Sequence, residues 1–450
     1  MNVSNTDSEY TNTTIRGWVP QPNGRGTFDL LVSCGVTIFL CGWSAICVNV
    51  PVSDHGKWDI FWDKWHMFCL SILGPEFVFM LALGQYMRAH ASIKLYHDKG
   101  FTDWTIKQGF YADMGGFVLQ PRGWKQFPIN AKQLLYLIER GHIRYPDTKV
   151  SEINDRNKSD GLARFLTACQ IIWFTLNVIA RPTQNLAVTT IEITTIATIV
   201  CTLGVNFCWR HKPMDVYTAI VLETDRSMYE IIEDAGDLYL EPYRMTPLDF
   251  LSREEWIATK LWNYNVNILR KLNVVRQRPQ VRPIQHLSSF NFPKLSLGGT
   301  VVCLFMAVAY SAILMIAWNF EFPSPAERLI WRICTSLTMA LTLVVGLIEI
   351  ALPSPRDPKD EEVARGTEMT RKAPSPNVLG RIAKKRFNNS LDKDRAMDVP
   401  LKSMLLTQPI CAIYTVCRIY VLLEDLIGLR AMPATVFQNV EWTIYWPHIK

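Results

Sequence analysis

Charged residues are scarce in this chain. Asp, Glu, Lys and Arg together make up only 20% of its 450 residues, whereas 49% are hydrophobic. The apolar residues gather in runs of about 20 with almost no charge, the length at which a helix crosses the ~30 Å hydrocarbon core of a bilayer. This distribution excludes a soluble enzyme, a disordered chain and a disulfide-stapled secreted module. It also disfavours a β-barrel, whose strands are short and alternate in polarity.

The motifs of several well-defined chemistries are missing as well. The chain has no DDxxD, NDxxD or DxDD carboxylate cluster to hold Mg²⁺ during ionisation of a diphosphate, and no glycine-rich phosphate loop. Its 11 Cys include no CxxC pair and its 8 His include no i, i+4 pair, so neither a disulfide framework nor a metal site is expected. The net charge of +6 comes without a basic stripe interleaved with aromatic residues. We therefore expect no cofactor and no nucleic-acid partner.

The apolar runs that are present predict an all-α fold, a polytopic transmembrane helix bundle with about seven spans. Residues 1–26 form a polar tail without the features of a signal peptide, and residues 27–352 form the transmembrane core. The predicted spans are 28–50, 66–88, 162–180, 187–209, 298–318, 330–352 and 404–423. Residues 353–403 are predicted to be a disordered, charged linker, and residues 404–450 the last span with an aromatic C-terminal segment.

Three long connections, 89–161, 210–297 and 353–403, carry most of the Lys and Arg. The positive-inside rule places them and the N-terminus in the cytosol and the C-terminus on the far side, so that the sequons at Asn2 and Asn12 stay unused. Apolar residues at helical spacing predict helices within the first two connections, at about 129–143, 214–234 and 253–273. The lipid bilayer is the expected partner and the endoplasmic reticulum the expected location, while the sequence fixes no oligomeric state.

A carboxyl group inside a membrane span is costly, on the order of 2.5–3.5 kcal/mol on insertion scales, and is a functional candidate for that reason. Glu76 lies near the middle of the second predicted span and follows Gly74 and Pro75, a pair that can kink the helix. Burial favours the neutral form of a carboxyl, so Glu76 is predicted to serve as a proton donor. The alternative is a carboxyl with structural partners only.

Two further carboxyls are candidates. Glu192 lies one to two turns into the fourth span among several Thr residues. It is either an acid–base partner of Glu76 or a structural carboxyl, bonded to Thr or amide side chains or paired with Arg418. Asp113 lies in the aromatic and glycine-rich segment 109–117, where ring faces can stabilise a carbocation. The alternative for that segment is an ordinary turn packed at the membrane surface.

Features along nearly the whole chain, apart from 353–403, resemble a large family of fungal integral membrane proteins. They are Trp18-Val-Pro-Gln-Pro, Arg25-Gly-Thr-Phe-Asp29, Cys34 to Pro51, Gly109 to Phe117, Ala180-Arg181 with Gln184 and Glu192, Lys212-Pro213, and Glu441-Trp442-Thr443 with Pro447-His448-Ile449. Pro182 departs from the residue expected after Ala180-Arg181. Some members are encoded beside secondary-metabolite genes, and membrane proteins of that setting include terpene cyclases that open an epoxide on a prenylated precursor. The resemblance implies this setting and transfers no catalytic residue.

Three functions remain open at this point. The first is a membrane-bound terpenoid or meroterpenoid cyclase, in which Glu76 protonates a lipophilic prenylated precursor and Glu192 or Asp113 removes the last proton, without a metal. The second is a small-molecule transporter, because intramembrane carboxylates also relay protons, although no internal repeat supports it. The third is a seven-helix receptor or scaffold. The cyclase is the leading hypothesis.

Overall fold

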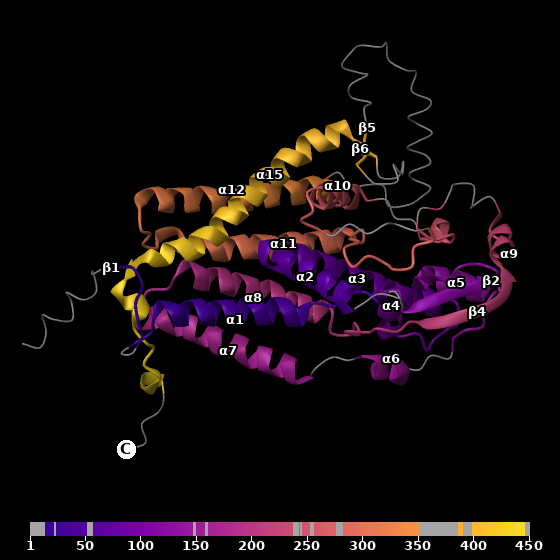
Figure 1. Cartoon of the computed structure of the whole chain (residues 1–450), viewed down its shortest axis with the longest axis horizontal. Helices are drawn as coiled ribbons and strands as arrows, with labels where there is room; N and C mark the ends of the chain where they lie inside the picture. The colour runs from indigo at the N-terminus through magenta and orange to yellow at the C-terminus, as the bar shows by residue number, and fades with distance from the viewer. Residues whose placement is uncertain are drawn as a thin grey trace, which may run out of the picture.

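The structure is a computed structural model that describes residues 14–21, 24–51, 57–146, 150–157, 161–236, 243, 245–252, 256–275, 282–351, 386–389 and 398–445. These residues are mostly helical. The long helices lie side by side in an elongated bundle, and a small domain with a β-sheet occupies one end of it (Figure 1). Most of the predicted linker 353–403 and the sequons at Asn2 and Asn12 lie outside the described residues.

Five helices are long and apolar enough to cross a membrane, which supports a polytopic membrane protein in contact with lipid. They are α1 (Thr27–Ala45), α7 (Gly161–Thr183), α8 (Thr190–Cys208), α11 (Leu297–Met315, continued by the 3₁₀ helix η4, Ile316–Asn319) and α12 (Pro325–Ala351). A further long helix, α15 (Leu401–Ile427), packs against α12 and α8. These six helices follow six of the seven predicted spans, with ends that differ by a few residues.

Polar residues directly before several helices fix where the helices begin. Thr189 and Glu192 form a capping box at the start of α8, and Ser296 caps α11. At the start of α1, Asp29 accepts a hydrogen bond from the backbone N–H of Gly26. Such caps satisfy N–H groups that have no partner inside the helix, which matters most where no water is at hand.

The predicted second span, 66–88, is not one helix. Its residues belong to α2 (Lys57–Leu73) and α3 (Pro75–His97), which meet at Gly74 with a bend of 118°. Pro75 is the first residue of α3, where its missing N–H leaves no bond unmade. Because a bend beyond a right angle reverses the chain, the outer ends of both helices lie toward the small domain and the tip lies inside the bundle (Figure 1). Judged by length and apolar composition, the described residues contain six candidate spans when the bent pair counts as one, instead of the seven predicted.

The connections 89–161 and 210–297 build the small domain, so the fold contains more than helices. In its sheet, β2 (Phe117–Arg122) pairs antiparallel with β3 (Phe127–Ile129) and parallel with β4 (Ile220–Ser227). The short helices here are α4 (Ile106–Asp113), α5 (Ala131–Glu139), α6 (Val150–Arg156), α9 (Met228–Glu233) and the 3₁₀ helix η3 (Asp249–Leu251). The helix predicted at 129–143 is confirmed as α5. The helix predicted at 214–234 is wrong over most of its length, because residues 220–227 pair with β2.

Two further elements lie near the start of α15. The helix predicted at 253–273 is confirmed as α10 (Ile257–Lys271). A two-residue pairing joins β5 (Arg386–Phe387) to β6 (Val399–Pro400), directly before α15.

The two ends of the described chain lie together, at the end of the bundle away from the small domain (Figure 1). There β1 (Thr14–Arg16) pairs antiparallel with β7 (Ala431–Pro433). The 3₁₀ helices η6 (Gly428–Arg430), η7 (Ala434–Phe437) and η8 (Trp442–Tyr445) belong to the same segment. The sequence analysis expected the two ends on opposite sides of the membrane, and in the structure the described residues nearest to both ends pair with each other. The bend at Gly74 breaks the second predicted span, so the count of seven spans on which that expectation depended does not hold among the described residues.

A buried lysine joins the bundle to the small domain. The Nζ of Lys212, four residues after the end of α8, donates to the carbonyl oxygen of Cys47 (2.8 Å), to Asn49 Oδ1 (3.2 Å) and to Gln85 Oε1 (2.9 Å). Its side chain also lies over the ring of Trp209, 4.9 Å from the ring centroid. Burial lowers the pKa of Lys212 to about 8. One ammonium group thus holds the ends of α1 and α8 and the side of α3 in register.

Candidate functional site

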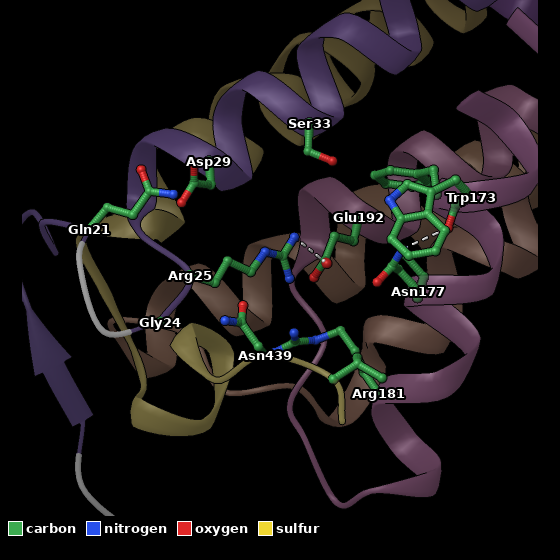
Figure 2. Close-up of a pocket in the computed structure, with 13 residues that line it drawn as sticks. Gln21, Gly24, Arg25, Asp29, Ser33, Trp173, Asn177, Arg181, Glu192 and Asn439 are labelled. Atoms are coloured by element: carbon green, nitrogen blue, oxygen red, sulfur yellow. Dashed lines mark hydrogen bonds and ion pairs between the residues drawn. The ribbon is translucent and has the colours of Figure 1, made fainter. Parts of the chain in front are cut away.

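A cavity of about 300 Å³ opens at the end of the bundle where the two ends of the described chain meet. Charged and amide side chains dominate its wall, with a few aromatic and aliphatic ones. The lining residues are Gln21, Gly24, Arg25, Asp29, Ser33, Trp173, Phe174, Asn177, Val178, Arg181, Glu192, Asn439 and Val440. The wall is therefore built from the segment before α1, from α1, α7 and the start of α8, and from the segment after η7 (Figure 2).

Glu192 is the buried anion of this cavity. Its side chain is 1% exposed, and its Oε1 lies 2.7 Å from Nη2 of Arg25. Its Oε2 accepts hydrogen bonds from the backbone N–H and the hydroxyl of Thr189, both at 2.9 Å. Figure 2 shows Arg25 reaching across the cavity to this carboxylate. The structural alternative of bonding to Thr therefore holds in part, but the charge partner is Arg25 and not Arg418.

Arg181 closes the cavity by fixing the C-terminal segment. Its guanidinium donates to four backbone carbonyl oxygens, those of Ala187 (2.8 Å), Gln438 (3.1 Å), Thr435 (2.9 Å) and Val436 (2.8 Å). Its side chain is buried, so these bonds replace its hydration. Of the two arginines in the wall, Arg181 is thus occupied by backbone, whereas Arg25 remains 15% exposed beside the open space.

Glu76 lies elsewhere, at the tip of the bent pair. Its Oε1 accepts a hydrogen bond from the hydroxyl of Tyr414 on α15. On the same face of α15, Arg418 donates through Nε to the carbonyl oxygen of Leu73 (3.0 Å), the last residue of α2. The guanidinium also stacks over the ring of Tyr310 on α11, 4.6 Å from the centroid. Arg418 is 1% exposed. The broken backbone is therefore surrounded by a carboxyl, two tyrosines and an arginine near the middle of the bundle.

Asp113 belongs to a third place, the small domain. It is the last residue of α4, and its Oδ1 accepts a hydrogen bond from the backbone N–H of Ala131 (3.2 Å), at the start of α5. The neighbouring Tyr111 and Phe117 pack into the core of that domain, in favour of the structural alternative for 109–117. The three candidate carboxyls therefore have separate surroundings, Glu192 in the cavity, Glu76 at the bend and Asp113 in the small domain.

The residues that the sequence analysis missed are mostly cations. Arg25 and Arg181 entered the sequence analysis only as part of the family resemblance, Arg418 only as a possible partner for Glu192, and Asp425 was not singled out. Their signal was present, because Arg and Asp inside or at the edge of an apolar run need named partners. In the described part of the chain no group of three or more His, Cys, Asp or Glu is arranged to hold a metal ion.

Comparison with known proteins identifies the family. The model of a family of unknown function, DUF8562, matches residues 2–233 and 284–449. The match includes the segment 353–403 that the resemblance left out, and it omits 234–283, which follows α9 and contains α10. No curated protein and no solved structure matches the chain. Because the matched residues cover most of its length, the chain belongs to DUF8562.

Proposed function

We propose that the protein is a membrane carrier for a small polar solute. The observation that carries this proposal is the break at Gly74, which brings a helix start, Glu76 and Arg418 together inside the bundle. Irregular backbone at membrane depth is tolerated where it is buried in protein or lines a polar space. Discontinuous helices near the bilayer midplane are a recurring way in which carriers build solute sites.

The charged cavity supports the same proposal. Its four ionisable wall residues comprise two cations, Arg25 and Arg181, and two anions, Asp29 and Glu192. Such a wall suits a polar or zwitterionic solute. It does not suit cyclisation of an apolar chain, which needs a dry space lined by apolar and aromatic groups.

The topology that goes with this function has six crossings, α1, α7, α8, α11, α12 and α15, with α2 and α3 as a re-entrant pair. An even number of crossings puts both ends of the chain on one side, in agreement with the pairing of β1 and β7. The positive-inside rule then assigns the small domain to the cytosol and the polar cavity to the opposite side.

The cyclase of the sequence analysis remains the second candidate, because Glu76 bonds to the hydroxyl of Tyr414, whose ring packs against the ring of Phe77. In that case Glu76 acts as the acid on a prenylated precursor in fungal secondary metabolism. The carrier is preferred because Tyr414 and Arg418 surround Glu76 with a hydrogen-bond donor and a positive charge, which are partners for a carboxylate.

One experiment separates the two functions. A strain that lacks the protein is complemented with the wild type, with Glu76→Gln or with the control Asp113→Asn, and metabolites are profiled separately in cells and medium. For a carrier, one unchanged compound shifts between cells and medium in the deletion and in Glu76→Gln, and Asp113→Asn restores it. Accumulation of a precursor isomeric with a lost product contradicts the carrier and supports the cyclase.

A further inference from the structure

Three polar side chains of α15 form a row inside the bundle. Tyr414, Arg418 and Asp425 are spaced by four and seven residues, so they lie on one face of the helix, and the row is about 16 Å long at 1.5 Å per residue. Arg418 is 1% exposed and Asp425 is 3% exposed. Opposite Asp425, α8 presents the hydroxyls of Thr190 and Thr194. The row therefore covers about half of a ~30 Å hydrocarbon core.

Many polar atoms along this row are buried and make no hydrogen bond of good geometry. They are both carboxylate oxygens of Asp425, the hydroxyls of Thr190, Thr194 and Tyr310, Nη1 and Nη2 of Arg418, and Oε2 of Glu76. Native proteins leave few buried polar atoms without a partner, and such groups in polar surroundings are usually bridged by water. The neighbouring carboxyl and hydroxyl groups of Asp425 and α8 are close enough for such bridges.

The outer end of the row lies near the cavity. Cys34 of α1, next to the wall residue Ser33, is within electrostatic reach of Arg25, Glu192 and Asp425. At its inner end the row reaches Glu76, which acts electrostatically on Cys201 of α8.

The helices α1, α3, α8, α11 and α12 contribute groups that face the row. Apart from Arg418 itself, the ionisable groups beside Asp425 and its helical neighbour Glu424 are Glu327 of α12, Tyr420 of α15, Arg430 of η6 and Cys34 of α1. Those beside Glu76 are Tyr414 of α15, Tyr310 of α11 and Cys201 of α8. Arg430 is paired with Glu327, whereas Arg418 lies between Asp425 and Glu76 along the row.

We propose that this row is a proton path that links the cavity to Glu76 through Asp425 and bridging water, and that the proton is the coupling ion of the carrier proposed above. Asp425 takes a proton from a water on the cavity side, forming one O–H bond as that water's O–H breaks, and the hydroxide left behind regains a proton from the solution in the cavity. It then releases the proton to the next water, and Glu76 accepts it at the bend. Arg418 balances the charge of whichever carboxyl is ionised. No electron transfer is involved, and the net change is one proton moved inward.

The test is infrared spectroscopy of the full chain in lipid vesicles, which follows the C=O stretching band of protonated carboxyl groups and its shift on exchange into D₂O. The band is recorded at a series of pH values in the wild type and in Asp425→Asn. The part of the band that is missing in the variant belongs to Asp425. Thr194→Val removes a hydroxyl beside Asp425 and is expected to slow exchange about tenfold, the rate effect of one lost hydrogen bond.

Thr198→Val is the matched control. It is the same substitution one turn along α8, but the Thr198 hydroxyl already bonds to the carbonyl oxygen of Thr194 (2.9 Å), so exchange should keep the wild-type rate. Equal rates in wild type and Thr194→Val overturn the path, as does an identical band in wild type and folded Asp425→Asn at every pH. If Asp425→Asn does not fold, the exchange rates of the two threonine variants still decide whether the proton path exists. Because the measurement needs no solute, a row that exchanges protons in a protein that moves no metabolite leaves the proton path standing and removes both the carrier and the role of the proton as its coupling ion.

Discussion

The ion pair between Arg25 and Glu192 makes an asymmetric prediction about stability. Glu192 is 1% exposed and Arg25 is 15% exposed, with 2.7 Å between Oε1 and Nη2. Arg25→Met leaves a buried carboxylate with Thr189 as its remaining partner. Breaking a buried pair in this way typically costs about 3–5 kcal/mol, and we expect about 3 kcal/mol because the cavity gives water some access.

The reverse substitution should be milder. Glu192→Gln keeps a residue that serves equally in a capping box with Thr189, and Arg25 can turn toward the open cavity. The expected loss is about 1 kcal/mol, the value of one hydrogen bond. The double variant Arg25→Met with Glu192→Gln should lose about 2 kcal/mol less than the sum of the single variants, because the first change already removes what the second would break.

The assay is the free energy of unfolding in mixed micelles, followed by tryptophan fluorescence as the fraction of denaturing detergent rises. Asp29→Asn lines the same cavity and serves as the control for a general effect of altering the wall. If Glu192→Gln destabilises as much as Arg25→Met, or if the two losses are additive, the carboxylate is not the group that Arg25 stabilises and the reasoning fails.

Further predictions concern the rest of the chain. The Lys212 pKa of about 8 lies below the ~10.4 of an unfolded lysine, so the unfolded state binds more protons between these values. Stability should therefore rise by up to about 3 kcal/mol as pH rises through that window, and Lys212→Met should abolish the rise in a series of thermal melts. Asp113→Asn keeps the acceptor for Ala131 N–H and should leave solute distribution between cells and medium unchanged; a loss would restore Asp113 as a site residue. Gly204→Val should destabilise by about 1–3 kcal/mol in the micelle assay, because its Cβ would lie 2.7 Å from the ring of Phe79; an unchanged value would mean that α3 and α8 do not pack as described. In a eukaryotic host, Asn12 should carry a glycan removable by an amidase, since the proposed topology puts the N-terminus outside the cytosol; an unmodified chain favours the orientation first predicted.

The helical part of the fold was predictable because lipid leaves a chain few choices. Runs of apolar residues with polar or Pro boundaries gave six of the long helices to within a few residues. The bend at Gly74 was underestimated as a kink. A Gly-Pro pair marks a break in the helix, but the angle of the break depends on what Leu73 and Glu76 bind, and those partners lie on α15, more than 300 residues away.

The sheet and the site were harder to predict for the same reason. β2 and β4 pair across about 100 residues, and the local hydrophobic periodicity of a strand does not predict a parallel partner at that distance. The sequence analysis singled out Glu192 and Glu76 as carboxyls inside apolar runs, but an apolar run does not say which partners each carboxyl meets. The helical spacing of Arg418 and Asp425 was readable in the sequence and would have marked α15 as the polar helix.

The four carbonyl bonds of Arg181 also bear on how the chain is made. Three of their acceptors lie in residues 435–438, and Thr435 is synthesised 254 residues after the arginine. Until that segment arrives, the nascent bundle holds a guanidinium at a membrane boundary with most of its donors unused. Insertion is therefore complete only when residues 435–438 have been synthesised and their carbonyl oxygens bind the guanidinium of Arg181. A chain that stops before residue 435 would keep an unmatched cation, a feature that quality-control machinery in a membrane can recognise.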